Sequence, residues 1–338
     1  MFATIFIIFE SMKHISILVP EGAILGSLEG SRQLLTQVNS FYAMRGAPPL
    51  FHVQLVGLNR NTQLSGGKFT VNPDALLNDI EKTDLIIIPA VDGDLNIALE
   101  RNKDFIPWIS QMHKNGSEVA SLCLGAFILA STGIVNGRKL ATHWLAENQF
   151  RSMFPEVQLV TEKIITDENG IYSSGGAFSY LNLILHLIEK FAGKEMAILS
   201  AKVFAIEMER ENQLSFTIFQ GQKDHADEQI KKAQEFIEKN YKDKISVDKL
   251  AEIVSISRRN LERRFKKATA NTVAEYTQRV KIEAAKASLE NSRQNINEVM
   301  YEVGYNDIKA FRTTFKKVTG LSPIEYRNKY NRETIMAN

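Results

Sequence analysis

The chain has 338 residues, of which 44% are hydrophobic and 24% charged, a length and composition that suit two globular domains and argue against disorder. Its single cysteine, Cys123, excludes an internal disulfide or a cysteine-rich metal site, and the six histidines show no paired metal-ligand spacing, so we expect no metal or cofactor. The net charge of +2 is unevenly spread, because residues 226–338 hold 23 Lys and Arg against 16 Asp and Glu, which places a polyanion-binding region at the carboxyl end.

The first residues resemble neither a signal peptide nor a membrane span. The apolar run from Phe2 to Phe9 lacks a basic region, is followed at once by Glu10 and is too short to cross a bilayer. We therefore interpret residues 1–12 as a leader or a misplaced start. No other segment approaches the roughly 18 apolar residues of a membrane span, so we expect a cytoplasmic protein with no membrane partner.

Residues 13–210 alternate strand-like and helix-like stretches, which predicts a mostly parallel sheet covered on both faces. The strand-like runs are Ile15–Val19, Phe51–Val56, Leu85–Pro89, Glu118–Leu122 and Gln158–Ile165. The helical patterns are Ser31–Met44, Phe105–Lys114, Ala126–Thr132, Ala141–Met153, Ala177–Phe191 and Glu195–Arg210. Gly66 and Gly67 predict a hairpin turn, and the polar stretch 211–225 is interpreted as a linker.

A possible nucleophile follows the fourth strand-like run. Val119–Gly125 has the pattern of a strand, then Cys-x-Gly, then a helix, which places Cys123 on a sharp turn like a nucleophile elbow. A helix amino terminus there favours the thiolate. His143, 20 residues later, could complete a catalytic Cys–His pair, whereas a lone cysteine beside a buried strand is often only a small hydrophobic residue.

Residues 13–210 resemble a PfpI-type domain of the class I glutamine amidotransferase-like superfamily, in the GlxA-like form that is fused to AraC-type domains. The matching pieces are Gly22, Gly30, Cys123–Phe127, Gly133, Gly137-Arg138, Thr142–Trp144 and Ser174–Ala177. The resemblance implies an α/β flavodoxin-like parallel-sheet sandwich. It maps the family's cysteine and histidine onto Cys123 and His143, but Ser27 stands at the position of the acidic partner. We therefore expect a sensor rather than an enzyme, with Ser27, Cys123, Leu124 and His143 as the candidate effector pocket.

Residues 226–330 have an all-helical pattern and contain an internal repeat. Phe265–Tyr276 aligns with Phe315–Tyr326 at an offset of 50, with six of twelve positions identical. The same offset pairs Leu250 with Met300 and Ile253 with Val303. The repeat predicts two copies of a helix, turn and helix, joined by a long helix over Val273–Leu289, with a tail at 331–338.

Each copy carries helix-capping signals and a polar outer face. In the first, Ser246 would cap Val247–Val254 and Ser257 would cap Arg258–Ala268; in the second, Ile296–Val303 is followed by Asp307, which would cap Ile308–Val318. Exposed side chains on the two second helices would lie in the DNA major groove. The sequence also places Arg264 and Lys317 among the exposed basic residues of these helices. The candidate DNA-binding residues are Arg258, Arg259, Glu262, Arg263, Lys309, Arg312, Thr313 and Lys316.

The repeat region resembles the DNA-binding domain of the AraC/XylS family. The residues that match the family are Gly304-Tyr305, Phe311, Phe315–Lys317, Gly320 and Ser322–Arg327. Ser255 differs from the family, which usually has glycine at this position of the first turn. The resemblance implies a transcription regulator that binds double-stranded promoter DNA, responds to a small-molecule effector and forms a homodimer, with RNA polymerase as a further candidate partner. Two alternatives stay open: a Cys-dependent hydrolase or hydratase that also binds DNA, and an interaction scaffold that has lost both activities.

Overall fold

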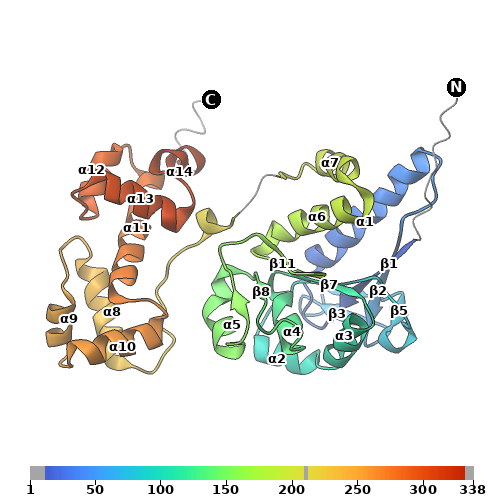
Figure 1. Ribbon diagram of the computed structural model, residues 1–338, viewed down its shortest axis with the longest axis horizontal. Coiled ribbons are helices and arrows are strands. Elements are labelled where there is room, and N and C mark those ends of the chain that lie inside the picture. The colour runs from blue at the N-terminus through green and yellow to red at the C-terminus, as the bar shows by residue number, and fades with distance from the viewer. Residues whose placement is uncertain (1–11, 209–211, 332–338) are drawn as a thin grey trace. The chain divides into compact units, whose positions relative to one another are not determined.

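The computed structural model describes residues 12–208 and 212–331, and its chain divides into two compact units between Gln213 and Leu214 (Figure 1). We call Met1–Gln213 the N-terminal unit and Leu214–Asn338 the C-terminal unit. Apart from Met12 and Asn331, the predicted leader and tail lie outside the described residues. The expected fold class is confirmed, with a mostly parallel α/β sheet in the first unit and a helical second unit.

Seven strands form the main sheet of the N-terminal unit, in the order β10-β11-β7-β6-β1-β2-β5. Neighbouring strands are parallel except for β10 and β11, which pair antiparallel at one edge. The strands are β1 (Lys13–Val19), β2 (Phe51–Gly57), β5 (Ala75–Leu76), β6 (Leu85–Ile88), β7 (Glu118–Leu122), β10 (Ile165–Asp167) and β11 (Ile171–Ser174). Because the carboxyl ends of the parallel strands share one edge, the loops that follow them meet there.

Alternate side chains of the central strands enter two separate cores, one on each face of the sheet. In β1, Ile15 and Ile17 enter the first core and Leu18 enters the second, where it meets Ile86 and Ile88 of β6. The first core is covered by α1 (Leu25–Met44), α6 (Tyr180–Ala192) and α7 (Lys194–Val203) (Figure 1). The second is covered by α2 (Leu95–Arg101), α3 (Phe105–Lys114), α4 (Ala126–Ser131) and α5 (Glu147–Met153).

Some predicted boundaries in this unit are wrong. Gln158–Ile165 is not one strand, because it contains the two-residue strand β9 (Gln158–Leu159), which pairs with β8 (Lys139–Leu140), and then only the first residue of β10. The chain reverses at Gly170, whose φ of 84° favours glycine, and this turn joins β10 to β11, a strand the sequence did not predict. The hairpin predicted at Gly66-Gly67 is confirmed between β3 (Thr62–Leu64) and β4 (Phe69–Val71).

Two lobes make up the C-terminal unit, each with its own apolar core, and one long helix serves both. The helices are α8 (Glu228–Asn240), α9 (Val247–Ile253), α10 (Arg258–Thr269), α11 (Val273–Asn291), α12 (Ile296–Glu302), α13 (Ile308–Thr319) and α14 (Pro323–Tyr330). α11 contributes Tyr276 to the lobe of α8–α10, and Ile282 and Leu289 to the lobe of α12–α14. At 1.5 Å per residue its 19 residues span about 28 Å, so the predicted connecting helix is confirmed.

The two lobes repeat the same plan, but the offset of 50 holds only from their second helices onward. α10 buries Leu261, Phe265 and Thr269, and α13 buries the residues 50 positions later, Phe311, Phe315 and Thr319. In the first helices the predicted pairing is wrong by one residue, since Ile253 is 43% exposed whereas Val303 is 1% exposed. Val254 is the buried equivalent of Val303, because the second turn contains one residue more than the first.

Candidate nucleic-acid interface and effector site

The turns within the two lobes share one backbone conformation. Ser255 and Gly304 each lie two residues after the last residue of a first helix, with positive φ of 54° and 74°. In each turn the next residue donates its N–H five residues back, Ile256 to Ala251 at 3.1 Å and Tyr305 to Met300 at 3.0 Å. This bonding is that of a Schellman helix end. Ser255 therefore adopts the left-handed conformation that glycine provides in the second lobe.

The second helices begin at the predicted caps. The Ser257 hydroxyl accepts the Asn260 N–H, and the Asp307 carboxylate accepts the N–H groups of Lys309 and Ala310 at 2.7 and 2.9 Å. α10 and α13 have matching apolar anchors, since an aromatic ring at the middle of each helix, Phe265 or Phe315, packs in its lobe core. The caps fix where each helix starts and the anchors fix which face it exposes.

On α10, the exposed face carries Arg259, Glu262 and Arg263, which the sequence assigned to DNA. Arg263 donates to the side chain of Asn260 on the same helix at 2.9 Å. Among the described residues Arg259 makes no ion pair, so its guanidinium is available to the two acceptors of a guanine. Glu262 holds Arg258 at 3.3 Å and could accept from a cytosine amino group.

Arg264 is not part of this face, although the sequence placed it among the exposed basic residues of the helix. Its guanidinium donates to both oxygens of Asp227 and, at 2.6 Å, to Gln229. Asp227 and Gln229 lie at the start of α8, so this ion pair ties α10 to the rest of its lobe. The Arg264 bond lowers the pKa of Asp227, which keeps that carboxylate charged.

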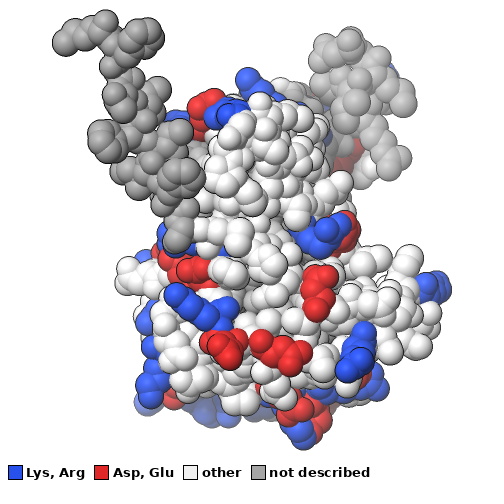
Figure 2. Space-filling model, turned by 90° about the vertical axis from the view of Figure 1, so that its right-hand side faces the viewer, with Lys and Arg blue, Asp and Glu red and all other residues white. Residues whose placement is uncertain are grey.

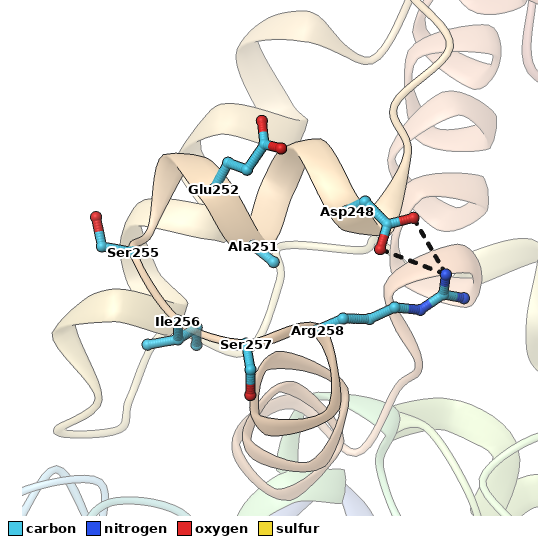
Figure 3. Close-up of a pocket in the computed structure, with 7 residues that line it drawn as sticks. All are labelled: Asp248, Ala251, Glu252, Ser255, Ile256, Ser257 and Arg258. Atoms are coloured by element: carbon cyan, nitrogen blue, oxygen red, sulfur yellow. Dashed lines mark hydrogen bonds and ion pairs between the residues drawn. The ribbon is translucent and has the colours of Figure 1, made fainter.

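Arg258 starts α10 but turns back toward the first helix. It reaches Asp248 of α9 at 3.1 Å and Glu262 at 3.3 Å, and Figure 3 shows its guanidinium facing the Asp248 carboxylate beside a depression at the turn. The depression has a volume of about 390 Å³ and is lined by Asp248, Ala251, Glu252, Ser255, Ile256, Ser257 and Arg258. With two acidic partners, Arg258 offers less free positive charge to DNA than Arg259.

On α13, the exposed face is simpler. Lys309, Arg312, Thr313, Lys316 and Lys317 are exposed on successive turns, and none makes an ion pair within the described part of the chain. Arg312 and Thr313 occupy the positions of Glu262 and Arg263, so the exposed faces of the two helices differ in charge. Lys316 and Lys317 lie in the last turn of α13.

Positive charge is not a general property of the surface. Figure 2 shows a face on which acidic and basic side chains lie close together around a broad uncharged area. The case for a nucleic-acid interface therefore depends on α10 and α13, where the residues, the caps and the buried anchors repeat together.

In the N-terminal unit, Cys123 lies on the expected elbow after β7. Its φ of 53° is the strained left-handed conformation, and a short 3-10 turn, η2 (Cys123–Gly125), leads into α4. The elbow packs tightly against the end of β6, because a Cβ on Gly125 would lie 2.4 Å from the carbonyl oxygen of Pro89. Two side chains hold the Cys123 backbone: the Ser174 hydroxyl accepts its N–H at 3.3 Å, and the Thr142 hydroxyl donates to its carbonyl at 2.9 Å.

The expectation that this turn favours a thiolate is wrong. Cys123 is only 3% exposed, and burial raises the pKa of its thiol to about 11, against a smaller opposing effect of the Leu124 backbone N–H. At pH 7 the sulfur is therefore a neutral thiol. Loss of solvation on burial has a larger effect on this pKa than the hydrogen bond from the Leu124 N–H, and within the described residues no hydrogen bond joins the sulfur to His143.

His143 and Leu124 are partly buried near this elbow. Thr142, whose hydroxyl bonds to the Cys123 carbonyl, precedes His143 directly, and Leu124 follows Cys123. The Nδ1 atom of His143 accepts the Leu145 N–H at 3.2 Å, and its ring lies 5.5 Å from that of Trp144. Burial lowers the pKa of His143, so the imidazole is neutral at pH 7. The site around Cys123 thus combines a neutral thiol with a neutral ring.

Ser27 is fully committed to holding the backbone. Its hydroxyl donates to the Ile24 carbonyl at 2.8 Å and accepts the Ala90 N–H at 3.0 Å, which joins the start of α1 to the loop after β6. The nearest acidic residue along the chain, Glu29, pairs with Arg32 at 2.7 Å instead. In the described part of the chain no group of three or more His, Cys, Asp or Glu side chains could hold a metal ion.

Gln213 also belongs to this site, although the sequence did not predict it. Gln213, which the sequence placed inside the predicted linker, is 1% exposed and bonds to both loops beside Cys123. A single glutamine in a polar stretch gives no signal of this kind, because the contact joins residues 71 positions apart.

The comparisons with known proteins agree with both units. Residues 250–329 match the model of a helix-turn-helix domain, and residues 38–190 match that of the DJ-1/PfpI family. The HTH-type transcriptional regulator GbdR of Pseudomonas aeruginosa is 26% identical over 268 residues, which cover 76% of this chain and 69% of that protein. The HTH-type transcriptional regulator CdhR of the same organism is 22% identical over 322 residues, covering 92% and 90%.

A solved transcriptional regulator from Vibrio parahaemolyticus is 25% identical with a TM-score of 0.52, covering 57% of this chain and 99% of the other. The chain thus joins a DJ-1/PfpI-type domain to an AraC-type helix-turn-helix domain, and its homologues are transcription regulators. DNA binding is the property that this class shares. In residues 12–208 and 212–331, no helix is both long and apolar enough to cross a membrane.

Proposed function

We propose that this protein is a sequence-specific transcription regulator whose affinity for its operator is set by a small molecule bound near Cys123. One observation carries the DNA-binding part: two helix-turn-helix lobes with matching caps, anchors and exposed faces are held on a single helix, α11. A helix of about 28 Å approaches the length of one DNA turn, about 34 Å, so one chain could place α10 and α13 in successive major grooves.

We further propose that the base-reading residues are Arg259, Glu262 and Arg263 on α10, with Lys309, Arg312 and Thr313 on α13. Arg258 and Lys316 would add contacts to the phosphate backbone of the DNA. Since Glu262 and Arg312 occupy equivalent positions with opposite charge, the two half-sites should differ in sequence. The operator would therefore be asymmetric within one chain's footprint.

For the effector, the neutral thiol of Cys123 and the neutral ring of His143 favour an uncharged polar contact over an ion pair. By its family resemblance the ligand would be a polar or nitrogen-containing small molecule that contacts Cys123, Leu124 and His143. Ser27 would support this site indirectly, since its hydroxyl is already hydrogen-bonded to the backbone of Ile24 and Ala90. The ligand must bind one conformation of the protein more tightly than another to act as a signal.

The same resemblance supports a homodimer, a cytoplasmic location and contact with RNA polymerase as further parts of the proposal. The direct test is selection of duplexes from a random DNA pool by the full chain, followed by affinity measurements at several salt concentrations. We expect one enriched sequence and an affinity that falls steeply with salt. Binding without sequence preference, or no binding at low salt, contradicts the proposal.

A Cys-dependent hydrolase or hydratase is the alternative that the elbow geometry at Cys123 favours. The raised pKa of Cys123 and the serine at position 27 argue against it, so we infer that the protein is not an enzyme. Cys123→Ala separates the two functions. Loss of turnover on amides, isonitriles or 2-oxoaldehydes with DNA binding retained would support the enzyme, whereas no turnover by the unaltered chain supports the sensor.

A further inference from the structure

Gln213 is the last residue of the N-terminal unit, and its side chain is buried among backbone groups. Its Nε2 donates to the carbonyl oxygens of Thr161 at 2.7 Å, Thr142 at 3.0 Å and Lys163 at 3.3 Å. Its Oε1 accepts the Gly176 N–H at 2.7 Å. The Gln213 backbone also donates to the Glu162 carbonyl at 3.0 Å, so both the side chain and the main chain of this residue are fixed.

Two of these partners belong to the loops that hold Cys123. Thr142 donates its hydroxyl to the Cys123 carbonyl, and Ser174, two residues before Gly176, accepts the Cys123 N–H. One amide group therefore links the loop that carries His143 to the loop that follows β11, with Cys123 held between them. Cys123 is bonded to the first loop through Thr142 and to the last residue of β11, Ser174, while Gln213 is bonded to both loops.

The fit around this amide leaves no spare room. A Cβ added to Gly175 would lie 2.4 Å from the Nε2 of Gln213 and 2.7 Å from its Cδ. All three of the atoms nearest to that Cβ belong to Gln213, so the absence of a side chain at Gly175 is what admits the glutamine.

Beyond Gln213 the chain is soon anchored again, within the C-terminal unit. The Ser215 carbonyl accepts the Tyr330 hydroxyl at 3.1 Å, and the Thr217 carbonyl accepts the Nζ of Lys286 at 2.6 Å. Only Leu214 lies between Gln213 and Ser215. Because only Leu214 separates the two residues, a displacement of Gln213 would be passed to Ser215 across a single residue.

We propose that Gln213 is a positioning residue that fixes the two loops around Cys123 and couples their arrangement to the segment entering the DNA-binding unit. The binding of a ligand near Cys123 rests on the function proposed above, but the bonds by which Gln213 holds the two loops do not depend on that function. A ligand that shifts Thr142 or Gly176 would weaken the bonds of Gln213, and by linkage a change imposed on that segment would alter the Cys123 loops.

The test uses the single thiol as a reporter of loop opening in the full chain. We would measure the rate at which iodoacetamide alkylates Cys123 at pH 8 in wild type and Gln213→Ala. We expect at least a tenfold faster reaction in the variant, since the buried thiol reacts only when the loops open. The rate should stay constant in low urea, because local opening exposes little surface, whereas global unfolding accelerates with denaturant.

Asn182→Ala is the matched control. Asn182 is also a buried amide of the N-terminal unit, 7% exposed, and it holds the Glu207 carbonyl at 2.6 Å, but it has no bond to the Cys123 loops. We expect its alkylation rate to stay within twofold of wild type. Equal rates in wild type and Gln213→Ala, equal acceleration in both variants, or a urea-dependent acceleration would overturn the proposal.

A second variant approaches the same contact from the other side. Gly175→Ala should accelerate alkylation of Cys123 as Gln213→Ala does, since the added Cβ displaces the Gln213 amide. If Gln213→Ala does not fold, Gly175→Ala alone tests whether this contact holds the loops closed. In the double variant the new methyl group finds vacated space, so its effect should be clearly less than the product of the two single effects. Independent, multiplicative effects would show that Gly175 and Gln213 do not act through one contact.

The coupling is tested with a duplex selected from a random pool by the wild-type chain. Saturating duplex should change the Cys123 alkylation rate of wild type by at least threefold, and Gln213→Ala should abolish that change while still binding the duplex. Duplex binding without any change in wild type overturns the coupling. If no duplex is selected, the proposed function fails, while the DNA-free rates still decide whether Gln213 positions the loops.

Discussion

The two turns of the helix-turn-helix lobes offer a matched pair of substitutions with opposite expected signs. Ser255 holds a left-handed conformation at φ 54°, which costs a non-glycine residue about 1–2 kcal/mol. Glycine removes this cost but loses about 0.5–1 kcal/mol through its greater freedom in the unfolded chain. Ser255→Gly should therefore stabilise the C-terminal unit by about 0.5–1 kcal/mol, which raises its melting temperature by about 3 °C.

Gly304→Ser reverses the exchange at the equivalent position of the second lobe. A Cβ there would lie 2.0 Å from the carbonyl oxygen of Lys242 and 2.8 Å from its carbonyl carbon, which are backbone atoms that cannot turn aside. Together with the φ of 74°, this contact should cost about 2–4 kcal/mol. It should also displace α13, so DNA affinity should fall with stability.

Thermal unfolding of the full chain, followed by circular dichroism at 222 nm, measures both effects. Both tryptophans, Trp108 and Trp144, lie in the N-terminal unit, so their fluorescence provides an internal control that neither substitution should move. A neutral or destabilising Ser255→Gly, or a Gly304→Ser that unfolds like wild type, would refute the equivalence of the two turns.

Three further predictions concern DNA contacts and charge. Arg259→Ala should weaken binding to the selected operator by about 1–3 kcal/mol and relax the preference at one base position. Lys317→Ala should instead weaken binding to all duplexes alike and make the affinity less dependent on salt. Identical behaviour of the two variants in binding titrations would contradict this division. Alkylation of Cys123 should rise about tenfold per pH unit from pH 7 to 10, since its pKa is about 11, and a plateau below pH 9 would contradict a buried neutral thiol. Asp227→Asn keeps the α8 cap but loses the Arg264 ion pair, so it should lower the free energy of unfolding in urea by about 1 kcal/mol at pH 7. Because the pKa of Asp227 is lowered in the folded protein, this difference from wild type should vanish as the pH falls below about 3.9 and through the folded pKa. A difference that does not change with pH would exclude the ion pair as its cause.

Features that depend on local patterns were predictable from the sequence. The caps at Ser257 and Asp307 come from side chains that bond within three residues, and the buried faces of α10 and α13 follow from apolar residues at helical spacing. The alternation of strands and helices likewise predicted the parallel sheet. The resemblance to the AraC/XylS family also drew attention to Ser255, because that family usually has glycine in the first turn.

Features set by distant contacts were not predictable in this way. The ion pair of Arg264 with Asp227 joins residues 37 positions apart, so the sequence could not remove Arg264 from the exposed face. The pKa of Cys123 depends on how deeply the elbow is buried, and the sequence pattern alone left open both a thiolate at a helix amino terminus and a buried neutral thiol. The one-residue difference between the turns was hidden because the strongly matching part of the repeat lies after them.

The most direct measurement of the central claim is guanine methylation interference on a duplex selected by the full chain. If α10 and α13 enter successive major grooves, modified guanines should block binding in two clusters about 10 base pairs apart. Arg259→Ala should weaken the interference in one cluster only, and Arg312→Ala in the other. A single cluster, or two clusters that respond alike to both substitutions, would contradict the presence of two DNA-reading helices in one chain.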